Sequence, residues 1–150
     1  MSTPARNGLA LFDMTGRVVL VTGGSKGLGL TIASGLASAG ADVALVSRNE
    51  AEVQAAAKQI ASSFGHRAIG LKADVAEEAD VARVVSRTLA DLGRIDVLVN
   101  NAGINIRGPI DSLTLEQFRK VQQVNTEGVW LSSRAVVPHM KERQWGRIIN

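Results

Sequence analysis

The sequence contains no cysteine and no tyrosine, and only 3% of its 150 residues are aromatic. Without cysteine the chain can form no disulfide and no thiolate metal site, and it has no cysteine nucleophile. The shortage of aromatic residues leaves valine, leucine, isoleucine and alanine to fill the core, a balance typical of parallel strands covered by helices. A hydrophobic content of 45% and a mean hydropathy of +0.10 predict a single globular domain.

Histidine and long apolar segments are also scarce. The two histidines, His66 and His139, are far apart in the sequence, and no carboxylates accompany them at metal-site spacing, so we predict no metal site. The first ten residues lack the apolar region of a signal peptide, and no apolar run reaches the length of a membrane span. We therefore expect a cytoplasmic protein without a membrane partner.

Charge gives little information about partners. The 17 basic and 14 acidic residues are interspersed, with a formal net charge of +3. Because no basic run is present, the pattern argues against a nucleic-acid partner. It is compatible with an anionic small ligand and with an ordinary solvated surface, and we interpret most of the cations as the latter.

Five short apolar runs alternate with segments of helical period. Gly40, Gly65 and Gly93 follow the helical segments, where a left-handed residue ends a helix without steric cost. Strict alternation predicts an α/β fold: a doubly wound parallel sheet of Rossmann type, covered by helices on both faces. We expect residues 1–10 to form a tail and residues 11–150 to form one domain, incomplete after its fifth strand. The expected strands cover residues 17–22, 41–47, 67–73, 95–100 and 147–150.

Two helix starts carry capping signals. Asn49 with Glu52, and Thr114 with Gln117, have the spacing of a capping box. The second pair predicts the start of one long helix that runs to about Met140.

A glycine-rich segment follows the first predicted strand and precedes an apolar helix. Residues 22–29 read TGGSKGLG. Glycine permits a tight turn and a close approach of the backbone, and the amino end of a helix stabilises a pyrophosphate through its free N–H groups and its dipole. A plain glycine-rich turn is the alternative, but the position in the first strand–helix unit favours nucleotide binding. A Walker-type phosphate loop is excluded, because no Gly-Lys-Ser/Thr follows.

This segment resembles the T-G-x-x-x-G-x-G fingerprint of the short-chain dehydrogenase/reductase family. Asp74-Val75, after the third strand, resembles the adenine-contacting pair of that family, and residues 100–103 match its N-N-A-G motif. The resemblance extends from about Phe12 to Asn150. Taken singly, Asp74 has the alternative role of a helix cap and the asparagines that of a polar turn. The resemblance implies that the cofactor is bound by Gly23, Ser25, Lys26, Gly27, Leu28, Gly29, Asp74, Val75, Asn101, Ala102 and Gly103.

The end of the second strand predicts which nicotinamide cofactor is bound. NAD-specific sites place an acid there, which accepts hydrogen bonds from the ribose hydroxyls and repels a 2′-phosphate. This sequence has Ser47-Arg48-Asn49, and a guanidinium binds a phosphate through two hydrogen bonds. Lys26 matches a second basic position of the NADP-preferring members. We therefore expect NADP(H) rather than NAD(H), with dual specificity left open.

The catalytic residues of the family are mostly missing from this sequence. Asn125 resembles the helix asparagine that completes a proton relay, and its spacing from Val121 and Gly128 predicts an inward face. The alternative is that it only bonds neighbouring backbone. The Ser, Tyr and Lys of the family have no counterpart, and without tyrosine the proton donor for a carbonyl is absent. We therefore interpret the chain as a fragment of an oxidoreductase that interconverts alcohols and carbonyls, and leave its own activity open.

The segments 11–13 and 103–107 resemble sugar-acid and polyol members such as gluconate 5-dehydrogenases. The resemblance also implies a small-molecule substrate and a homo-oligomer, a dimer or tetramer. A non-catalytic NADP(H)-binding or protein-interaction module is the main alternative. A methyltransferase is disfavoured, since Ser47-Arg48 replaces the acid that would bind its ribose.

Overall fold

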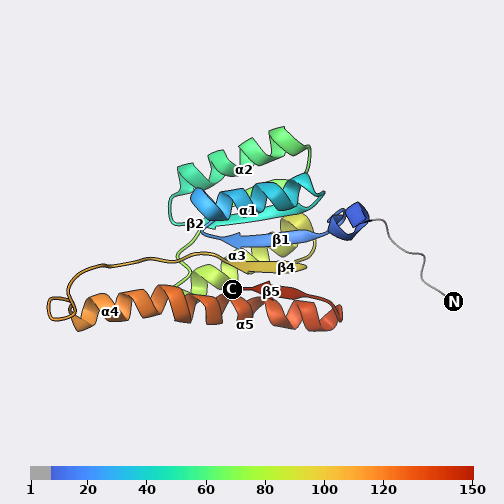
Figure 1. Cartoon of the computed structure of the whole chain (residues 1–150). Coiled ribbons are helices and arrows are strands. Elements are labelled where there is room, and N and C mark those ends of the chain that lie inside the picture. Colours follow the sequence, from blue (N-terminus) through green and yellow to red (C-terminus); the bar gives the residue numbers. More distant parts are fainter. Residues whose placement is uncertain (1–7) are drawn as a thin grey trace.

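The computed structural model describes residues 8–150, which form a five-stranded parallel sheet in the order β3-β2-β1-β4-β5 (Figure 1). From β1 the chain adds strands first on one side and then, after a reversal, on the other. The predicted doubly wound α/β fold is therefore confirmed. The strands are β1 (Val18–Thr22), β2 (Asp42–Ser47), β3 (Ala68–Lys72), β4 (Val97–Asn100) and β5 (Arg147–Ile149).

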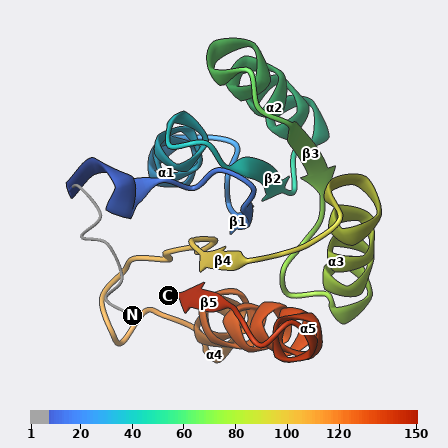
Figure 2. The same ribbon diagram turned by 90° about the vertical axis from the view of Figure 1, so that its right-hand side faces the viewer.

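Helices cover both faces of this sheet, as Figure 2 shows. Helices α1 and α2 lie on one face, and α3 and α5 lie on the other. A short 3-10 helix, η1 (Gly8–Phe12), precedes β1, so the expected tail lies outside the described residues except for its last three. The helices are α1 (Gly27–Ser38), α2 (Glu50–Phe64), α3 (Glu78–Leu92), α4 (Leu115–Gln122) and α5 (Gly128–Glu142).

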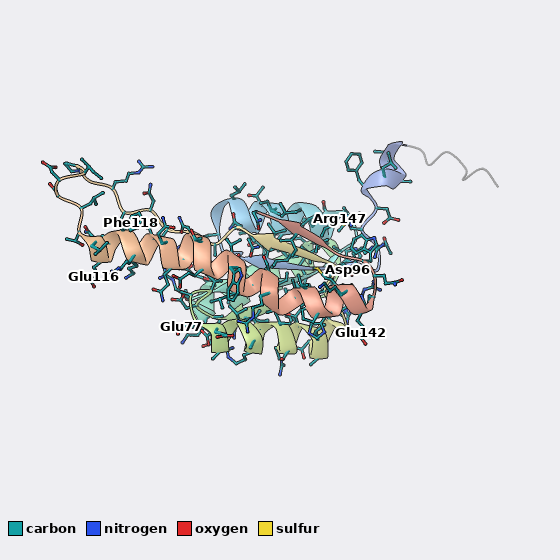
Figure 3. All side chains as sticks on the ribbon, turned by 90° about the horizontal axis from the view of Figure 1, so that it is seen from below. Glu77, Asp96, Glu116, Phe118, Glu142 and Arg147 are labelled. Carbon is teal, nitrogen blue, oxygen red and sulfur yellow. The ribbon has the colours of Figure 1, made fainter. Side chains whose placement is uncertain are left out.

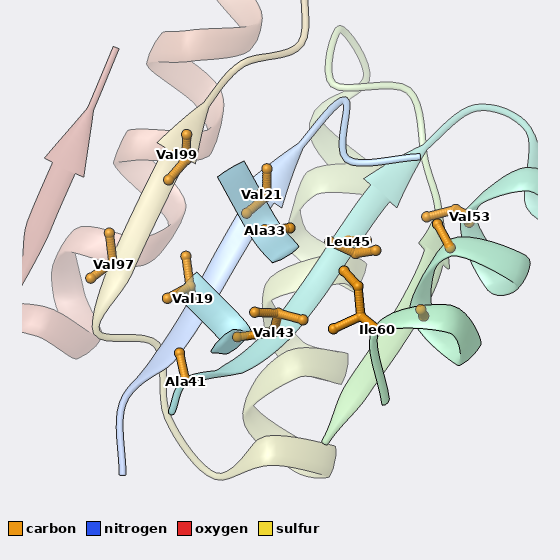
Figure 4. Close-up of a cluster of buried hydrophobic side chains, with 13 residues drawn as sticks. Val19, Val21, Ala33, Ala41, Val43, Leu45, Val53, Ile60, Val97 and Val99 are labelled. Carbon is orange, nitrogen blue, oxygen red and sulfur yellow. The ribbon is translucent and has the colours of Figure 1, made fainter. Parts of the chain in front are cut away.

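The core consists of two apolar layers, one on each face of the sheet. Because side chains alternate along a strand, Val19 and Val21 of β1 pack towards α1 and α2 (Figure 4), whereas Val18 and Leu20 pack on the opposite face towards α3 and α5. All four are almost fully buried. Parallel strands buried on both faces explain the unbroken apolar runs of the sequence.

The helix ends follow the sequence signals. Gly65 and Gly93 end α2 and α3 in the left-handed conformation, with φ of 73° and 85°. Thr114 and Gln117 form the predicted reciprocal capping box. Asn49 accepts a hydrogen bond from the Glu52 N–H at 3.2 Å, although here the reciprocal bond to Glu52 comes from the asparagine side chain.

The predicted single helix from Thr114 to about Met140 is interrupted. A π-helical segment, η2 (Gln123–Glu127), joins α4 to α5. A wider turn rotates the residues that follow it, so the regular helical spacing no longer defines one face. The expectation that Asn125 faces inward is therefore wrong: Asn125 is exposed, and Val124 is the buried residue of the segment.

The strand at the β5 edge of the sheet is partly exposed. At the β5 edge, Ile148 and Ile149 are 37% and 52% exposed, and the strand pairs with β4 alone among the described strands. None of the helices between residues 8 and 150 is long and apolar enough to cross a membrane.

Candidate functional site

A cleft of about 260 Å³ lies at the carboxyl edge of the sheet, where the order of the strands reverses. The register places the end of β1 beside both neighbours, since Thr22 pairs with Val46 and with Asn100. Ligands of open α/β sheets bind at such a switch point. Most of the predicted binding residues line this cleft, namely Gly23, Ser25, Lys26, Arg48, Asp74, Val75, Asn101, Ala102 and Gly103.

The glycine loop forms one wall of the cleft and has no space for side chains at its base. Gly23 has a positive φ of 65°, and a Cβ at Gly29 would overlap the carbonyl oxygen of Gly23 and the side-chain amide of Asn101. Lys26 precedes α1 in an extended conformation, and its side chain does not cap the helix. The N–H groups of the first helical turn have no partner within the helix, so they suit an anionic ligand.

Three predicted residues of this loop do not line the cleft. Gly29 is buried at the start of α1 and lets the helix approach the loop. Gly27 adopts a positive φ of 56° with open space around it, and the Leu28 side chain is 69% exposed. Their proposed contribution is therefore to the backbone of the loop rather than to side-chain contacts.

Asn101 ties the glycine loop to the end of β4. Its Nδ2 donates to the carbonyl oxygens of Thr22 and Gly23, both at 3.1 Å. The backbone N–H groups of Asn101 and Ala102 both donate to Thr22 Oγ1, also at 3.1 Å. The two loops predicted to bind the cofactor are therefore held together before any ligand arrives.

The segment after β3 forms the opposite wall. Asp74 Oδ1 accepts a hydrogen bond from the N–H of Ala76 at 3.0 Å, so Asp74 does not cap α3, whose first flanking residue is Glu77. The N–H of Asp74 donates to Asp80 Oδ2 at 2.8 Å. This backbone hydrogen bond, followed by the bond from Arg83, lowers the pKa of Asp80 below its ordinary value of 3.8.

The cations of the cleft lie at the ends of β1 and β2. Arg48 is exposed, lines the cleft, and makes no hydrogen bond or ion pair with any residue between 8 and 150. Lys26 is different, because its Nζ lies 3.4 Å from Glu52 Oε2. The hydroxyl oxygens of Ser25 and Ser47 are 3.1 Å apart and join the glycine loop to the end of β2.

The comparisons with known proteins agree with this geometry. A family model described as short chain dehydrogenase matches residues 17–150. The chain belongs to this family.

Several short-chain dehydrogenases are similar along nearly the whole chain. The 2-dehydro-3-deoxy-D-gluconate 5-dehydrogenase of Formosa agariphila is 36% identical over 93% of this chain and 53% of its own length. The 2-(R)-hydroxypropyl-CoM dehydrogenase of Xanthobacter autotrophicus is 39% identical over 89% of this chain and 55% of its own. The chain thus spans about half the length of the curated relatives it matches.

A solved short-chain dehydrogenase shares the fold closely. The crystal structure of a gluconate 5-dehydrogenase from Burkholderia cenocepacia, in complex with NADP and tartrate, is 40% identical, with a TM-score of 0.89. The match covers 96% of this chain and 56% of that one. The predicted resemblance to the family and to its gluconate 5-dehydrogenases is confirmed.

Asn125 is the remaining predicted residue of this short-chain dehydrogenase, and it lies next to the cleft without lining it. Its side chain brackets the backbone of Ile104: Oδ1 accepts from the N–H at 2.8 Å, and Nδ2 donates to the carbonyl oxygen at 2.9 Å. Both of these hydrogen bonds of the Asn125 side chain are thus to backbone, as the alternative stated, but that backbone belongs to the loop after β4 and not to its own helix.

Sequence reasoning missed some residues of the cleft. Val46, Ala73, Ile104 and Val124 line it but have no polar group that would mark them in a sequence. Three of them directly precede or follow residues that were predicted, so continuing each motif by one position would have found them. Glu52 was recognised only as a helix-capping residue, and its contact with Lys26 has no sequence signal.

Proposed function

We propose that this short-chain dehydrogenase binds NADP(H) in the cleft and, as a whole protein, interconverts an alcohol and a carbonyl. The observation that carries the proposal is the guanidinium of Arg48 at the end of β2, which has no partner among residues 8–150 and lies where an NAD-specific site would have an acid. A planar guanidinium binds a phosphate through two parallel charge-assisted hydrogen bonds.

The residues of the cleft fit this cofactor. The space that a Cβ at Gly29 would fill allows close packing under the loop, and the amino end of α1 faces an anionic pyrophosphate in our proposal. We assign Asp74 and Val75 to the adenine end and residues 101–103 to the ribose region. Arg48 and Lys26 would hold the 2′-phosphate. When bound, the nicotinamide supplies or accepts a hydride.

We propose a sugar acid or polyol as the substrate class. The support is the similarity to two dehydrogenases whose names specify gluconate derivatives, one of them solved with NADP and tartrate. The hydroxypropyl-CoM relative is equally similar in sequence, so the substrate needs a direct test. Because the chain spans about half the length of these relatives, activity and substrate are proposed for the whole protein.

For Asn125 we propose a positioning role in the proton relay. Its two hydrogen bonds to Ile104 fix the loop that follows β4, and that loop forms part of the cleft. A fixed loop keeps the reacting groups in one geometry, which is how positioning residues contribute to rate.

We also propose that the protein forms a homo-oligomer. In Figure 3, Phe118 projects from α4, which extends beyond the sheet. Phe118 and Trp130 of the α4–α5 helices are 58% and 59% exposed, and large exposed apolar side chains on one element are typical of protein interfaces. Size-exclusion chromatography with light scattering tests this directly, with a monomer as the contradicting result.

The cofactor proposal is tested by calorimetric titration of the full-length protein with NADPH and NADH. We expect tighter binding of NADPH. Arg48→Asp should reverse this preference, because a carboxylate accepts ribose hydroxyls and repels a phosphate. Arg119→Asp makes the same charge change at an exposed site on α4 outside the cleft, and it should leave both affinities unchanged.

Three outcomes would contradict parts of the proposal. If the protein binds NADPH and NADH equally tightly and Arg48→Asp alters neither affinity, Arg48 does not determine the cofactor preference. NADPH binding without oxidation or reduction of any gluconate-type alcohol or ketone would contradict the proposed substrate class, and binding without turnover of any alcohol or carbonyl would favour a non-catalytic binding module over the enzyme.

A further inference from the structure

An acidic side chain lies behind the cleft, in contact with one of its two cations. Glu52 is in the first turn of α2, and its Oε2 is 3.4 Å from Lys26 Nζ and 3.4 Å from Ser25 Oγ, which donates to it. Its other oxygen, Oε1, accepts a hydrogen bond from Asn49 Nδ2 at 3.1 Å. Glu52 therefore connects the glycine loop at the end of β1 with the turn that carries Arg48.

This placement changes the charge of the cleft at its β2 end. Lys26 and Arg48 are the cations that line the cleft, and one of them already has an acidic partner. The positive charge available to a ligand is therefore close to that of Arg48 alone. A phosphate carries up to two negative charges, so next to Lys26 it would also experience repulsion from the Glu52 carboxylate.

The contact is exposed enough to be exchanged for a ligand. The side chains of Lys26 and Glu52 are 79% and 40% exposed, so water and salt screen the pair. Its 3.4 Å separation is longer than that of a strong charge-assisted hydrogen bond. Lys26 is therefore held in place without being sequestered, and a phosphate has to compete with Glu52 for it.

We propose that Glu52 is a specificity-determining residue that weakens the preference for the phosphorylated cofactor. It does so by partly neutralising Lys26, and it leaves the affinity for the unphosphorylated cofactor almost unchanged. This inference rests on the proposed function, in which the 2′-phosphate of NADP(H) lies at Lys26 and Arg48.

The variant Glu52→Gln removes the negative charge of residue 52 while it keeps the size of the side chain. Glutamine is as favourable as glutamate at this position of a helix, and its amide oxygen still accepts a hydrogen bond. The matched control is Glu50→Gln in the same helical turn. Glu50 has the same relation to the helix dipole, but its carboxylate accepts from Gln54 and does not contact the glycine loop.

The experiment measures dissociation constants of NADPH and NADH for the full-length protein by calorimetry, at low salt and at about 0.5 M salt. At low salt, Glu52→Gln should tighten NADPH binding about two- to fivefold, in the range of an exposed ion pair, and change NADH binding less than about twofold. The gain should shrink at high salt. Glu50→Gln should change neither constant, and in a Lys26→Met background the gain from Glu52→Gln should be smaller, because only the direct repulsion between the Glu52 carboxylate and the phosphate remains.

The results separate the two proposals. If the wild type binds neither cofactor, or binds NADH more tightly, the proposed function fails whatever Glu52 does. If the wild type prefers NADPH but Glu52→Gln leaves the ratio unchanged or lowers it, only the inference about Glu52 is overturned. A gain that is undiminished in the Lys26→Met background would overturn the coupling through Lys26.

Discussion

The amino and carboxyl edges of the sheet each gather cations and an acid, with opposite results. At the amino edge, the Asp96 carboxylate is fully buried. It accepts hydrogen bonds from the Val18 backbone N–H and from the side chains of Arg17, Arg94 and Arg143, at 2.8 to 3.3 Å. At the carboxyl edge, Arg48 has no partner among the described residues, and Lys26 contacts Glu52 at 3.4 Å.

This difference separates a structural role from a binding role. The Asp96 cluster joins the starts of β1 and β4 to the end of α5, and because the carboxylate is fully buried it is not accessible to a ligand. Figure 3 shows Asp96 near Arg147 at this end of the molecule, whereas Glu116 and Phe118 lie at the other end. Arginine next to an acid is therefore not informative by itself, and what distinguishes Arg48 is that it lines a cleft and has no partner among the described residues.

The largest expected effect comes from breaking the amino-edge cluster. Asp96→Asn leaves three arginines without their counter-charge, and because their side chains are 27–39% exposed we expect a cost of about 2–3 kcal/mol, below that of a fully buried pair. We expect the free energy of unfolding in urea to fall by that amount. Asp91→Asn removes an acid from the exposed pair with Arg87, and it should change stability by less than about 0.5 kcal/mol. A loss below about 1 kcal/mol in Asp96→Asn would show that the cluster does not stabilise the fold.

Two arginine variants compare the amino edge with the carboxyl edge, and we expect smaller effects from them than from Asp96→Asn. Arg143→Met removes hydrogen bonds to Asp96 and to the Ile95 carbonyl oxygen, so it should cost about 1–2 kcal/mol of stability and leave NADPH affinity unchanged. Arg48→Met should do the reverse. NADPH binding should weaken about tenfold, because one charged hydrogen-bonding group is lost, while the free energy of unfolding should stay within about 0.5 kcal/mol of the wild type. Urea unfolding and calorimetry measure both quantities.

Two results would contradict this contrast between a structural and a cofactor-binding arginine. An Arg143→Met protein with normal stability but weakened NADPH binding would mean that the amino edge acts on the cofactor site. An Arg48→Met protein that is destabilised as strongly as Arg143→Met would give Arg48 a structural role instead.

The fold was predictable because its signals are local. Apolar runs mark strands buried on both faces, and Gly65 and Gly93 end helices where a left-handed residue is needed, so the element order follows from short segments. The π-helical turn at residues 123–127 was not predictable, since its apolar spacing still fits a regular helix nearly as well. That turn is also why the predicted inward orientation of Asn125 was wrong.

The site was predictable to the extent that it lies at strand ends. The loop at residues 22–29, Asp74 and Asn101 each follow a strand directly, and parallel strands bring their carboxyl ends together. The contacts of Glu52 with Lys26 and of Asp96 with Arg143 join residues far apart in the sequence. Nothing in the local pattern distinguishes those residues from a helix cap or from solvated surface charges.

The smallest expected effect concerns Asp80, which supports the cleft wall by accepting the Asp74 N–H. Because the pKa of Asp80 is lowered in the folded state, its carboxylate stabilises the fold at pH values above its ordinary pKa of 3.8. That contribution is lost as the pH falls through the lowered folded pKa. Asp80→Asn should therefore reduce stability by less than about 1 kcal/mol at pH 7 and pH 5, since the side chain is partly exposed.

The difference between wild type and Asp80→Asn should shrink as the pH falls below 3.8 and disappear below the lowered folded pKa, where both proteins carry an uncharged group at this position. Urea unfolding across this range measures it. Glu78→Gln is the matched control, because Glu78 lies in the same helical turn but pairs with Arg134 of α5 rather than with the backbone of the cleft wall. A difference that grows towards acid pH would contradict the lowered pKa. An Asp80→Asn protein with unchanged stability at pH 7 would show that the Asp80 carboxylate, unlike the buried carboxylate of Asp96, does not stabilise the fold.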